Sequence, residues 1–406
     1  ECCARCNSTA QCKGWCFFTK PNTPLTIEGI TSTTTTTSTE CALFRTVTPT
    51  NLQPGDCTSG ITRQPQPPQP PPSPPGAKNV LYLIVDDLRT QLGSYGHSET
   101  LTPRIDNLAS RGLQFSNAYC QVGVCSPSRN SFMSGRFPDS IKTWTFTTNF
   151  RQVPGGEDWV AFPQHFKLHG YTTLGGGKTY HPNRPPNWDE PKSWSQDLPY
   201  FPFYESGCPN GTTYEHAFCP LKGNLSQFFD HQLADWAIGA LQYATVNKSG
   251  TPFAIFAGFR RPHLPWVIPQ SFWDMYAHVE IAPPAHPHSP NQMPDIAFTC
   301  GDECAWTMWN DTSLAHCSEF CDGRTVNYSL TQPVTPPVAS LLRRAYYAAT
   351  SYLDFEIGRL IDELDTSGAA NNTVIVLHGD HGWGLGENNL WHKMTNFEGD
   401  DDDDDD

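Results

Sequence analysis

The sequence predicts an α/β protein in which helices flank a mixed β-sheet, and three segments carry that prediction. Val80 to Val85 are apolar at every position, a pattern typical of a strand that is buried on both faces. Thr373 to Leu377 form a second apolar run. Before it, a long helix is expected with Ser340 as its N-cap and Gly368 at its end. Strand, helix and strand in alternation are typical of an open α/β sheet.

A short helix is predicted downstream of the first strand, within residues 101–112. Thr102 is the expected N-cap, and Pro103 lies in the first turn, where its missing N–H is tolerated. Ile105 and Leu108 share one face of this helix, and a glycine ends it.

Composition divides the chain into four parts. Residues 1–62 are rich in Cys and Thr and are expected to form a small separate module. Residues 63–76 are rich in Pro and predict a semi-rigid, extended linker. The α/β domain is expected at residues 77–399. Residues 400–406 are all Asp, and such a run is either a solvated, disordered tail or an artefact.

The charge and the apolar runs exclude two classes of function. The net charge is -15, of which the terminal Asp run supplies seven, and the remaining balance of about -8 argues against a nucleic-acid-binding protein. No run of about 20 apolar residues occurs, so no membrane span is predicted. The first residue is Glu1 rather than Met, as expected of a mature protein or a fragment.

Fifteen cysteines and seven Asn-x-Ser/Thr sequons predict a secreted or lysosomal protein. Cys208 and Cys219 flank a short loop, and most of the other cysteines can be interpreted as disulfide partners. Two C-x3-C motifs at residues 300–304 and 317–321 leave a zinc site open, although no His-x-His pattern lies nearby. The sequons begin at Asn7, Asn210, Asn224, Asn247, Asn310, Asn327 and Asn371.

Acidic residues follow both predicted strands. Asp86 and Asp87 come directly after the first, and Asp380 and His381 come shortly after the second. Adjacent carboxylates repel each other, and a cation is the simplest way to keep both ionised. If the strands are neighbours, these four residues converge on one divalent ion. The alternative is that Asp86 caps a helix and Asp380 is solvated.

Cys125 opens the string Cys-Ser-Pro-Ser-Arg. Arg129 lies four residues later and shares a helical face with Cys125 if a helix begins at Ser126 or Pro127. A helix N-terminus beside an Arg favours an anion, whether a thiolate, a phosphate or a sulfate. The alternative is that Cys125 is a buried structural thiol or one half of a disulfide.

The string at 125–129, followed by Ser-Gly-Arg at 134–136, resembles the signature of the sulfatase family. The resemblance covers about residues 77–398 and is closest to the iduronate-2-sulfatase branch. It implies an alkaline-phosphatase/sulfatase-like fold. The other matching strings are VDDLR (85–89), GGKTYHP (176–182), RRPHLPW (260–266), SYLDFEIGRL (351–360), DHGWGLGE (380–387) and WHKMTNFE (391–398).

The resemblance implies a cofactor and a modified residue. In this family the cysteine of the signature is oxidised to formylglycine by a formylglycine-generating enzyme in the secretory pathway. A hydrated aldehyde offers one hydroxyl for attack on sulfur, and its other hydroxyl lets the covalent intermediate expel sulfate. The implied ligands of a Ca²⁺ ion, for which Mg²⁺ is an open alternative, are Asp86, Asp87, Asp380, His381 and the modified Cys125.

The resemblance also implies roles for the other polar residues. Lys178 and Lys393 would hold the sulfate oxygens, and Arg129 would stabilise the formylglycine hydrate. His181 would orient or deprotonate that hydrate, and His263 would protonate the leaving alkoxide. Taken alone, Lys178 is equally an exposed turn residue, and His263 a packing residue.

Two residues bear on the substrate. Arg89 would meet a uronate carboxylate, and Trp383 would stack on a sugar ring unless it belongs to the core. The implied reaction is therefore hydrolysis of a sulfate ester on a sulfated sugar or glycosaminoglycan. Two hypotheses stay open beside it: a phosphonate or phosphate monoester hydrolase of the same superfamily, and a non-catalytic carbohydrate-binding protein.

The two ends of the chain carry further expectations. Residues 2–16 and a later C-x-L resemble part of a PAN/apple module, which binds protein or carbohydrate, although a generic Cys-rich stalk is the alternative. The resemblance to sulfatases stops at Glu398. The C-terminal subdomain of that family is therefore expected to be missing from this chain.

Overall fold

The computed structural model describes residues 72–204, 207–210, 217–294, 297–298 and 329–395, with the backbones of strands 15–18, 41–43, 57–58, 317–319 and 326–328. The chain divides into two compact units, residues 1–69 and 70–406. In the first unit, β1 (Trp15–Phe18), β2 (Cys41–Leu43) and β3 (Cys57–Thr58) pair antiparallel in the order β2-β1-β3. The rest of the predicted PAN/apple-like module, most of the cysteine set at 300–321 and the Asp tail lie outside the described residues.

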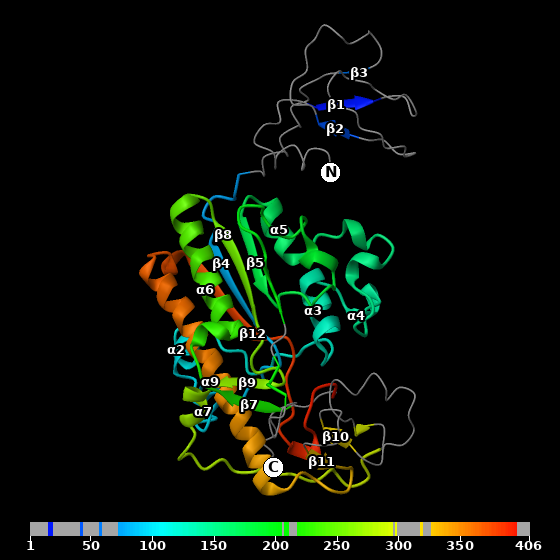
Figure 1. The fold of residues 1–406 in the computed structure, drawn as a ribbon, viewed down its shortest axis with the longest axis vertical. Coiled ribbons are helices and arrows are strands. Elements are labelled where there is room, and N and C mark those ends of the chain that lie inside the picture. The colour runs from blue at the N-terminus through cyan, green and yellow to red at the C-terminus, as the bar shows by residue number, and fades with distance from the viewer. Residues whose placement is uncertain are drawn as a thin grey trace. The chain divides into compact units, whose positions relative to one another are not determined.

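The second unit is built on a five-stranded sheet with the order β12-β4-β8-β5-β6 (Figure 1). All four pairings are parallel. The two strands expected from their apolar runs are β4 and β12, and they are neighbours in the sheet. The predicted α/β class is thereby confirmed. The strand bounds are β4 Asn79–Val85, β5 Thr172–Gly177, β6 Phe201–Pro202, β8 Phe253–Phe259 and β12 Thr373–Gly379.

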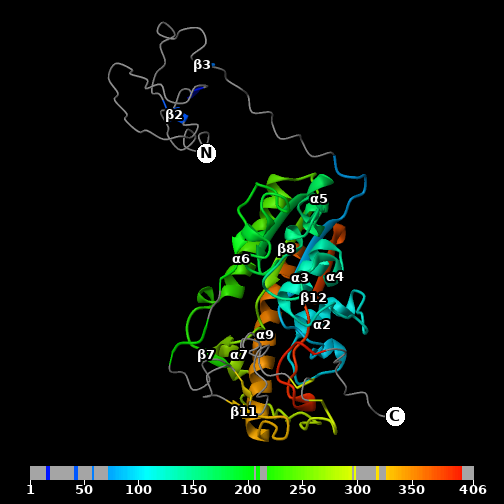
Figure 2. The same ribbon diagram turned by 90° about the vertical axis from the view of Figure 1, so that its right-hand side faces the viewer.

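Helices cover both faces of this sheet, as Figures 1 and 2 show. Successive side chains of a strand point to opposite faces, so β4 contributes to two cores. Leu81 and Leu83 pack with α6 and α9, whereas Ile84 packs with α3 and α5. None of the described helices is long and apolar enough to cross a bilayer. The helix bounds are α2 Pro103–Ser110, α3 Cys125–Ser134, α4 Pro138–Ile141, α5 Phe162–Leu168, α6 Phe229–Gln242, α7 Gln270–Asp274 and α9 Pro336–Thr366.

A further hydrophobic core lies beyond the carboxyl ends of the strands. It contains Trp266, Trp383 and Trp391 together with the first half of α9. The parallel pair β7 (Phe218–Leu221) and β9 (Trp266–Pro269) packs there, and a disulfide joins Cys208 to Cys219. Strands β10 (Cys317–Glu319) and β11 (Val326–Tyr328) form an antiparallel pair.

The structure corrects two details of the predicted elements. The long helix begins at Pro336 after Thr335, so Ser340 lies inside it and is not its N-cap; its end near Gly368, where φ is 74°, is as predicted. Strand β12 is not buried on both faces: among the described strands it is at the edge of the sheet, and its side chains are largely half-exposed. An apolar run predicts a strand but does not say how many neighbours the strand has.

Candidate active site

Four parallel strands deliver polar residues to one edge of the sheet. The last residues of β4, β12 and β8 lie in register with one another, and β5 ends beside β8. The residues that follow these strands are Asp86, Asp380, Arg260 and Lys178. Because the strands are parallel, these residues all leave the sheet at the carboxyl ends of the strands. Open α/β sheets place their ligand sites at this edge.

The turns after β4 and β12 are linked through Asp380. Asp87 has a left-handed backbone with φ of 62°, which turns the chain sharply after Asp86. The N–H of Asp87 donates to Asp380 Oδ1 at 3.1 Å, and the N–H of His381 donates to the same oxygen at 3.0 Å. The carboxylate of Asp380 therefore fixes two neighbouring turns relative to each other.

Helix α3 brings Cys125 to this edge. Val124 has an extended backbone, the helix begins at Cys125, and Gly135 ends it with φ of 65°. Pro127 lies in the first turn, where its missing N–H costs no helical hydrogen bond. Cys125 is buried, and it is not in a disulfide. The alternative that Cys125 is one half of a disulfide is thus excluded, and a helix that carries Arg129 is present as expected, although it begins at Cys125 rather than at Ser126 or Pro127.

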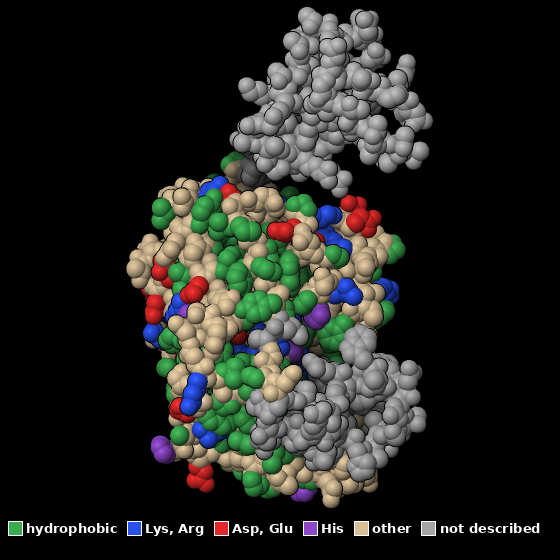
Figure 3. Space-filling view, viewed as in Figure 1, with side chains coloured by type: hydrophobic (Ala, Val, Ile, Leu, Met, Phe, Trp, Pro, Cys, Tyr) green, Lys and Arg blue, Asp and Glu red, His purple; other side chains and the backbone are tan. Residues whose placement is uncertain are grey.

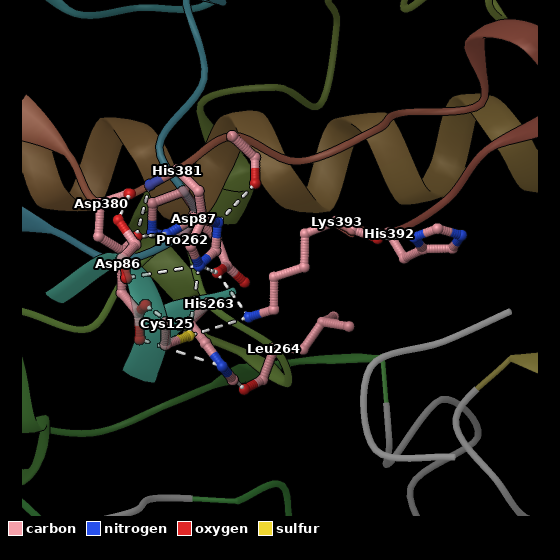
Figure 4. A network of polar contacts seen from close by, with 12 residues as sticks. Asp86, Asp87, Cys125, Pro262, His263, Leu264, Asp380, His381, His392 and Lys393 are labelled. Atoms are coloured by element: carbon pink, nitrogen blue, oxygen red, sulfur yellow. Dashed lines mark hydrogen bonds and ion pairs between the residues drawn. The ribbon is translucent and has the colours of Figure 1, made fainter. Parts of the chain in front are cut away.

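The thiol of Cys125 lies at the centre of a cluster of charged and imidazole side chains (Figure 4). Its Sγ is 3.2 Å from Lys393 Nζ, 3.3 Å from His381 Nε2 and 3.7 Å from Lys178 Nζ. It also lies 3.3 Å from Asp86 Oδ1. Figure 4 shows Lys393 reaching toward Cys125 while its neighbour His392 points away.

Three cations are paired with the three buried carboxylates. Arg129 Nε lies 2.9 Å from Asp380 Oδ2, and its Nη2 lies 3.3 Å from Asp86 Oδ1. Lys178 pairs with the other oxygen of Asp86. Lys393 Nζ lies 2.9 Å from Asp87 Oδ1. Buried charges are tolerated only when they are paired in this way, so removal of any one member leaves an opposite charge uncompensated.

The charges around Asp86 and Cys125 set their protonation. Burial alone would raise the pKa of Asp86, but the positive charges of Lys178, Arg129 and Lys393 outweigh it and hold the pKa well below its usual range. Burial, followed by the negative charge of Asp86, raises the pKa of the Cys125 thiol well above its ordinary value. The carboxylate is therefore ionised while the thiol keeps its proton, and an unmodified Cys125 is a poor nucleophile here.

The donor set fits a divalent cation. Donor atoms of Asp86, Cys125, Asp380 and His381 all lie within 4.8 Å of one another, and those of Asp86, Asp87, Cys125 and His263 do so as well. Three of these six residues are aspartates, and carboxylate oxygens are the ligands that hard cations such as Ca²⁺ and Mg²⁺ prefer. The burial of three carboxylates at one point is also the arrangement that a cation stabilises.

Comparison with known proteins identifies the family. Residues 78–404 match the model of the sulfatase family. The chain belongs to that family. It is 36% identical over 338 residues to iduronate 2-sulfatase of Homo sapiens, covering 79% of this chain and 58% of that protein. It is 27% identical over 340 residues to choline-sulfatase of Rhizobium meliloti, covering 80% of this chain and 61% of that one.

The sulfatase resemblance expected from the motifs is therefore confirmed at the level of the family. The chain spans less than two thirds of the length of these relatives. Among solved structures, the phosphonate monoester hydrolase of Agrobacterium radiobacter has a similar fold, with a TM-score of 0.56 at 19% identity. That match covers 79% of this chain and 66% of the other.

The two histidines predicted for proton transfer differ in position. His263 Nε2 lies 4.0 Å from Asp86 Oδ2, at the edge of the cluster. No hydrogen bond joins the His181 ring to the cluster among the described residues; its Nδ1 contacts the carbonyl oxygen of Pro182 at 3.2 Å. Burial and Lys393 lower the pKa of His263 well below its ordinary value, and burial with Lys178 lowers that of His181 to about 3. Both rings are therefore neutral in this structure.

The two predicted substrate residues lie beside the acidic cluster. Arg89 Nη1 is 3.1 Å from Glu387 Oε2 and 3.2 Å from the carbonyl oxygen of Trp383. Glu387 is shared with Arg343 at 2.8 Å. The Trp383 ring belongs to the hydrophobic core and is 4% exposed, with Lys393 Nζ 5.8 Å from its centroid. In this structure the Arg89 guanidinium is therefore ion-paired with Glu387, and the Trp383 ring is packed in the hydrophobic core.

Sequence reasoning missed Asp230. This buried residue in the first turn of α6 accepts from the N–H groups of Arg260 at 2.6 Å and Arg261 at 3.3 Å. Arg261 in turn donates to the carbonyl oxygen of His263 at 2.6 Å. Asp230 thus holds the turn after β8 that carries His263. A lone acidic residue at the start of a mostly apolar helix offers no sign of a partner about 30 positions away.

Proposed function

We propose that this protein hydrolyses sulfate esters after oxidation of Cys125 to formylglycine. The observation that carries the proposal is the position of Cys125 at the N-terminus of α3, with Lys178, Lys393 and His381 within 3.7 Å of its sulfur. Lys178 and Lys393 bring two ammonium groups to one reactive atom, and such groups can hold the oxygens of an anionic substrate. The high pKa of the thiol argues against catalysis by the cysteine itself.

The residues around Cys125 divide the work of binding and proton transfer. A sulfate group placed over Cys125 would meet Lys178 and Lys393 from two sides, so both ammonium groups would stabilise charge that grows on its oxygens. Arg129, fully buried against Asp86 and Asp380, has little freedom to move and would hold the modified side chain in place.

His263 is the proposed general acid. Its imidazole is neutral in this structure, because burial and Lys393 lower its pKa. The negative charge of a bound sulfate raises the pKa of a neighbouring imidazole, and an acidic compartment increases the protonated fraction further. His263 then donates its proton to the leaving oxygen.

The proposed cofactor is Ca²⁺, with Mg²⁺ as the alternative. Asp86, Asp87, Asp380 and His381 would hold the ion together with the modified Cys125. The bound cation would add positive charge opposite the sulfate oxygens and orient the nucleophile. With Asp86 and Asp87 engaged in this way, Lys178 and Lys393 can turn toward the substrate.

The proposed substrate is a sulfated, uronate-containing sugar. The support is the 36% identity to iduronate 2-sulfatase and the position of Arg89 beside the cluster. A uronate carboxylate would compete with Glu387 for the Arg89 guanidinium. We place the protein in the secretory pathway, secreted or lysosomal, because a disulfide joins Cys208 to Cys219 and because formylglycine is made there.

The decisive experiment combines mass spectrometry with paired ester assays. The full chain is expressed with a formylglycine-generating enzyme, and the peptide that spans residue 125 is sequenced by mass spectrometry. We expect formylglycine, and a kcat/KM for an aryl sulfate at least about 100-fold above that for the matched aryl phosphate, a difference of about 2.7 kcal/mol in transition-state binding. A Cys125→Ala variant serves as the inactive control.

Three kinds of outcome would contradict the proposal in different ways. An intact thiol at residue 125, or full activity of the Cys125→Ala variant, would exclude the formylglycine mechanism. Preference for the phosphate ester would favour the phosphonate or phosphate monoester hydrolase hypothesis instead. Absence of hydrolysis with both esters, despite formylglycine at residue 125, would favour a non-catalytic fragment.

A further inference from the structure

A second concave surface lies beside α6, and the described residues that line it include none of those around Cys125. This groove has a volume of about 650 Å³ and lies along the C-terminal half of α6. Its walls include Leu198, Trp236, Tyr243 and Val246. Strand β8 begins at Phe253, shortly after this end of α6, and runs from there toward the active-site edge. The groove is therefore separate from the proposed catalytic cluster.

The groove is predominantly apolar and open to solvent. Val246 is 75% exposed, and the rings of Trp236 and Tyr243 are half-buried in the walls. Figure 3 shows hydrophobic side chains gathered on the face of the molecule over α6. The volume lies within the range of sites that bind small organic groups.

Asn247 lies in the wall of this groove and begins the sequon Asn247-Lys248-Ser249. Asn247 and Ser249 are both exposed, in the turn that follows α6. Within the described part of the chain the side-chain amide group of Asn247 makes no hydrogen bond. By contrast, the side chain of Asn224, which begins another sequon, accepts a hydrogen bond from the N–H of Ser226 at 3.0 Å.

We propose that Asn247 carries an N-linked glycan whose first sugar rings lie in this groove, against Trp236, Tyr243 and Val246. In the modification, the Asn247 amide nitrogen bonds to the anomeric carbon of a lipid-pyrophosphate-linked oligosaccharide. The bond from that carbon to the pyrophosphate oxygen breaks, the pyrophosphate leaves with the electron pair, and the amide loses one proton. The glycan is then tethered at the wall of the surface that it covers.

The chemistry of the groove matches a sugar ring. Pyranose rings have a face of C–H groups that packs on aromatic and aliphatic side chains, and an edge of hydroxyl groups that needs polar partners. Trp236 and Val246 supply the apolar surface, and the exposed side chain of Gln242 supplies hydrogen-bonding groups at the rim. The tether raises the local concentration of the sugar, so even a weak contact is occupied.

The test uses the full chain, produced in a host that glycosylates secreted proteins. Peptide mass spectrometry reports occupancy at Asn247, and thermal unfolding reports the contact. Asn247→Gln and Ser249→Ala each remove the glycan, and each should lower the unfolding midpoint by about 2 °C. Asn371→Gln removes a sequon whose asparagine is exposed and does not line the groove, and should leave the midpoint unchanged.

A second variant separates the contact from the mere presence of the glycan. Val246→Ser keeps the sequon but replaces an exposed apolar wall residue. In this background Asn247→Gln should lower the midpoint by less than it does in the parent, and after enzymatic deglycosylation all four single variants should unfold together with the parent. An unmodified Asn247, an equal effect of Asn247→Gln and Asn371→Gln, or an effect of Asn247→Gln that is undiminished by Val246→Ser would each overturn the proposal.

Discussion

Strands β4 and β12 have similar apolar sequences but different surroundings. Leu83 in the middle of β4 is fully buried, whereas Val374 in β12 is 49% exposed. Strand β4 pairs on both sides, with β12 and β8, while β12 pairs only with β4 among the described residues. Nevertheless Asp86 and Asp380, which follow the two strands, are equally inaccessible, at 0% and 1% exposure.

The burial of the site residues therefore does not depend on the burial of the strands that precede them. Helix α3 covers the turn after β12: Arg129 pairs with the Asp380 carboxylate, and the Ser128 hydroxyl donates to the Asp380 carbonyl oxygen. The charged cluster is thus enclosed by α3 and by the loop that carries Lys393. An edge strand can therefore present a site residue as rigidly as a central one.

The largest effect is expected from the two aspartates that end these strands. Asp86→Asn and Asp380→Asn should each lower kcat/KM for a sulfate ester by on the order of 10³-fold, about 4 kcal/mol, because each removes a proposed cation ligand and leaves Arg129 underpaired. Steady-state kinetics at saturating Ca²⁺ tests this. Asp362→Asn is the control, since that carboxylate is 54% exposed in a surface ion pair. A mild effect of Asp380→Asn alone would mean that the edge position weakens the site after all.

The strands themselves should respond unequally. Leu83→Ala in β4 should lower the free energy of unfolding by about 2–5 kcal/mol, because it opens a cavity in a closed core. Val374→Ala in β12 should cost less than about 1 kcal/mol, because half of that side chain is already in water. Urea titrations of both variants measure the difference. Equal losses would show that β12 is covered in solution.

Residues with a strong local signature were the ones predictable from sequence. Apolar runs located β4 and β12, and the acidic residues after them predicted a common cluster before any family was considered. The string beginning at Cys125 then linked that cluster to sulfatases. These inferences succeed because each depends on neighbours in sequence or on the shared edge of a parallel sheet.

Features that depend on distant packing could not be predicted in the same way. The edge position of β12 depends on sheet order, which its own residues do not encode. Ser340 has the chemistry of an N-cap, but the helix extends four residues further to Pro336, where proline is favoured in the first turn. Asp230 positions the turn that carries His263 by accepting two backbone hydrogen bonds. No sequence pattern predicts that Asp230 contacts this turn.

A pH-dependent effect is predicted for the contact that ties the segment after β4 to the helix before β12. Asp354 of α9 accepts from the N–H groups of Arg104 at 3.0 Å and Ile105 at 2.7 Å, at the start of α2. Burial raises the pKa of Asp354 to about 7, above its usual value, although these N–H groups oppose the shift. The folded state therefore holds a proton that the unfolded chain has already lost between about pH 4 and pH 7.

A raised carboxyl pKa makes its contribution to stability largest in acid, and that contribution is lost as pH rises through about 7. Relative to Asp354→Asn, which cannot titrate, the parent should lose about 2 kcal/mol of unfolding free energy between pH 5 and pH 8. Urea titrations of the two proteins across this pH range measure the change. Asp230 and the other carboxyls are common to both proteins, so their titration cancels in the difference. Parallel pH profiles would show that Asp354 is ionised throughout, and that the link between α2 and α9 does not depend on pH.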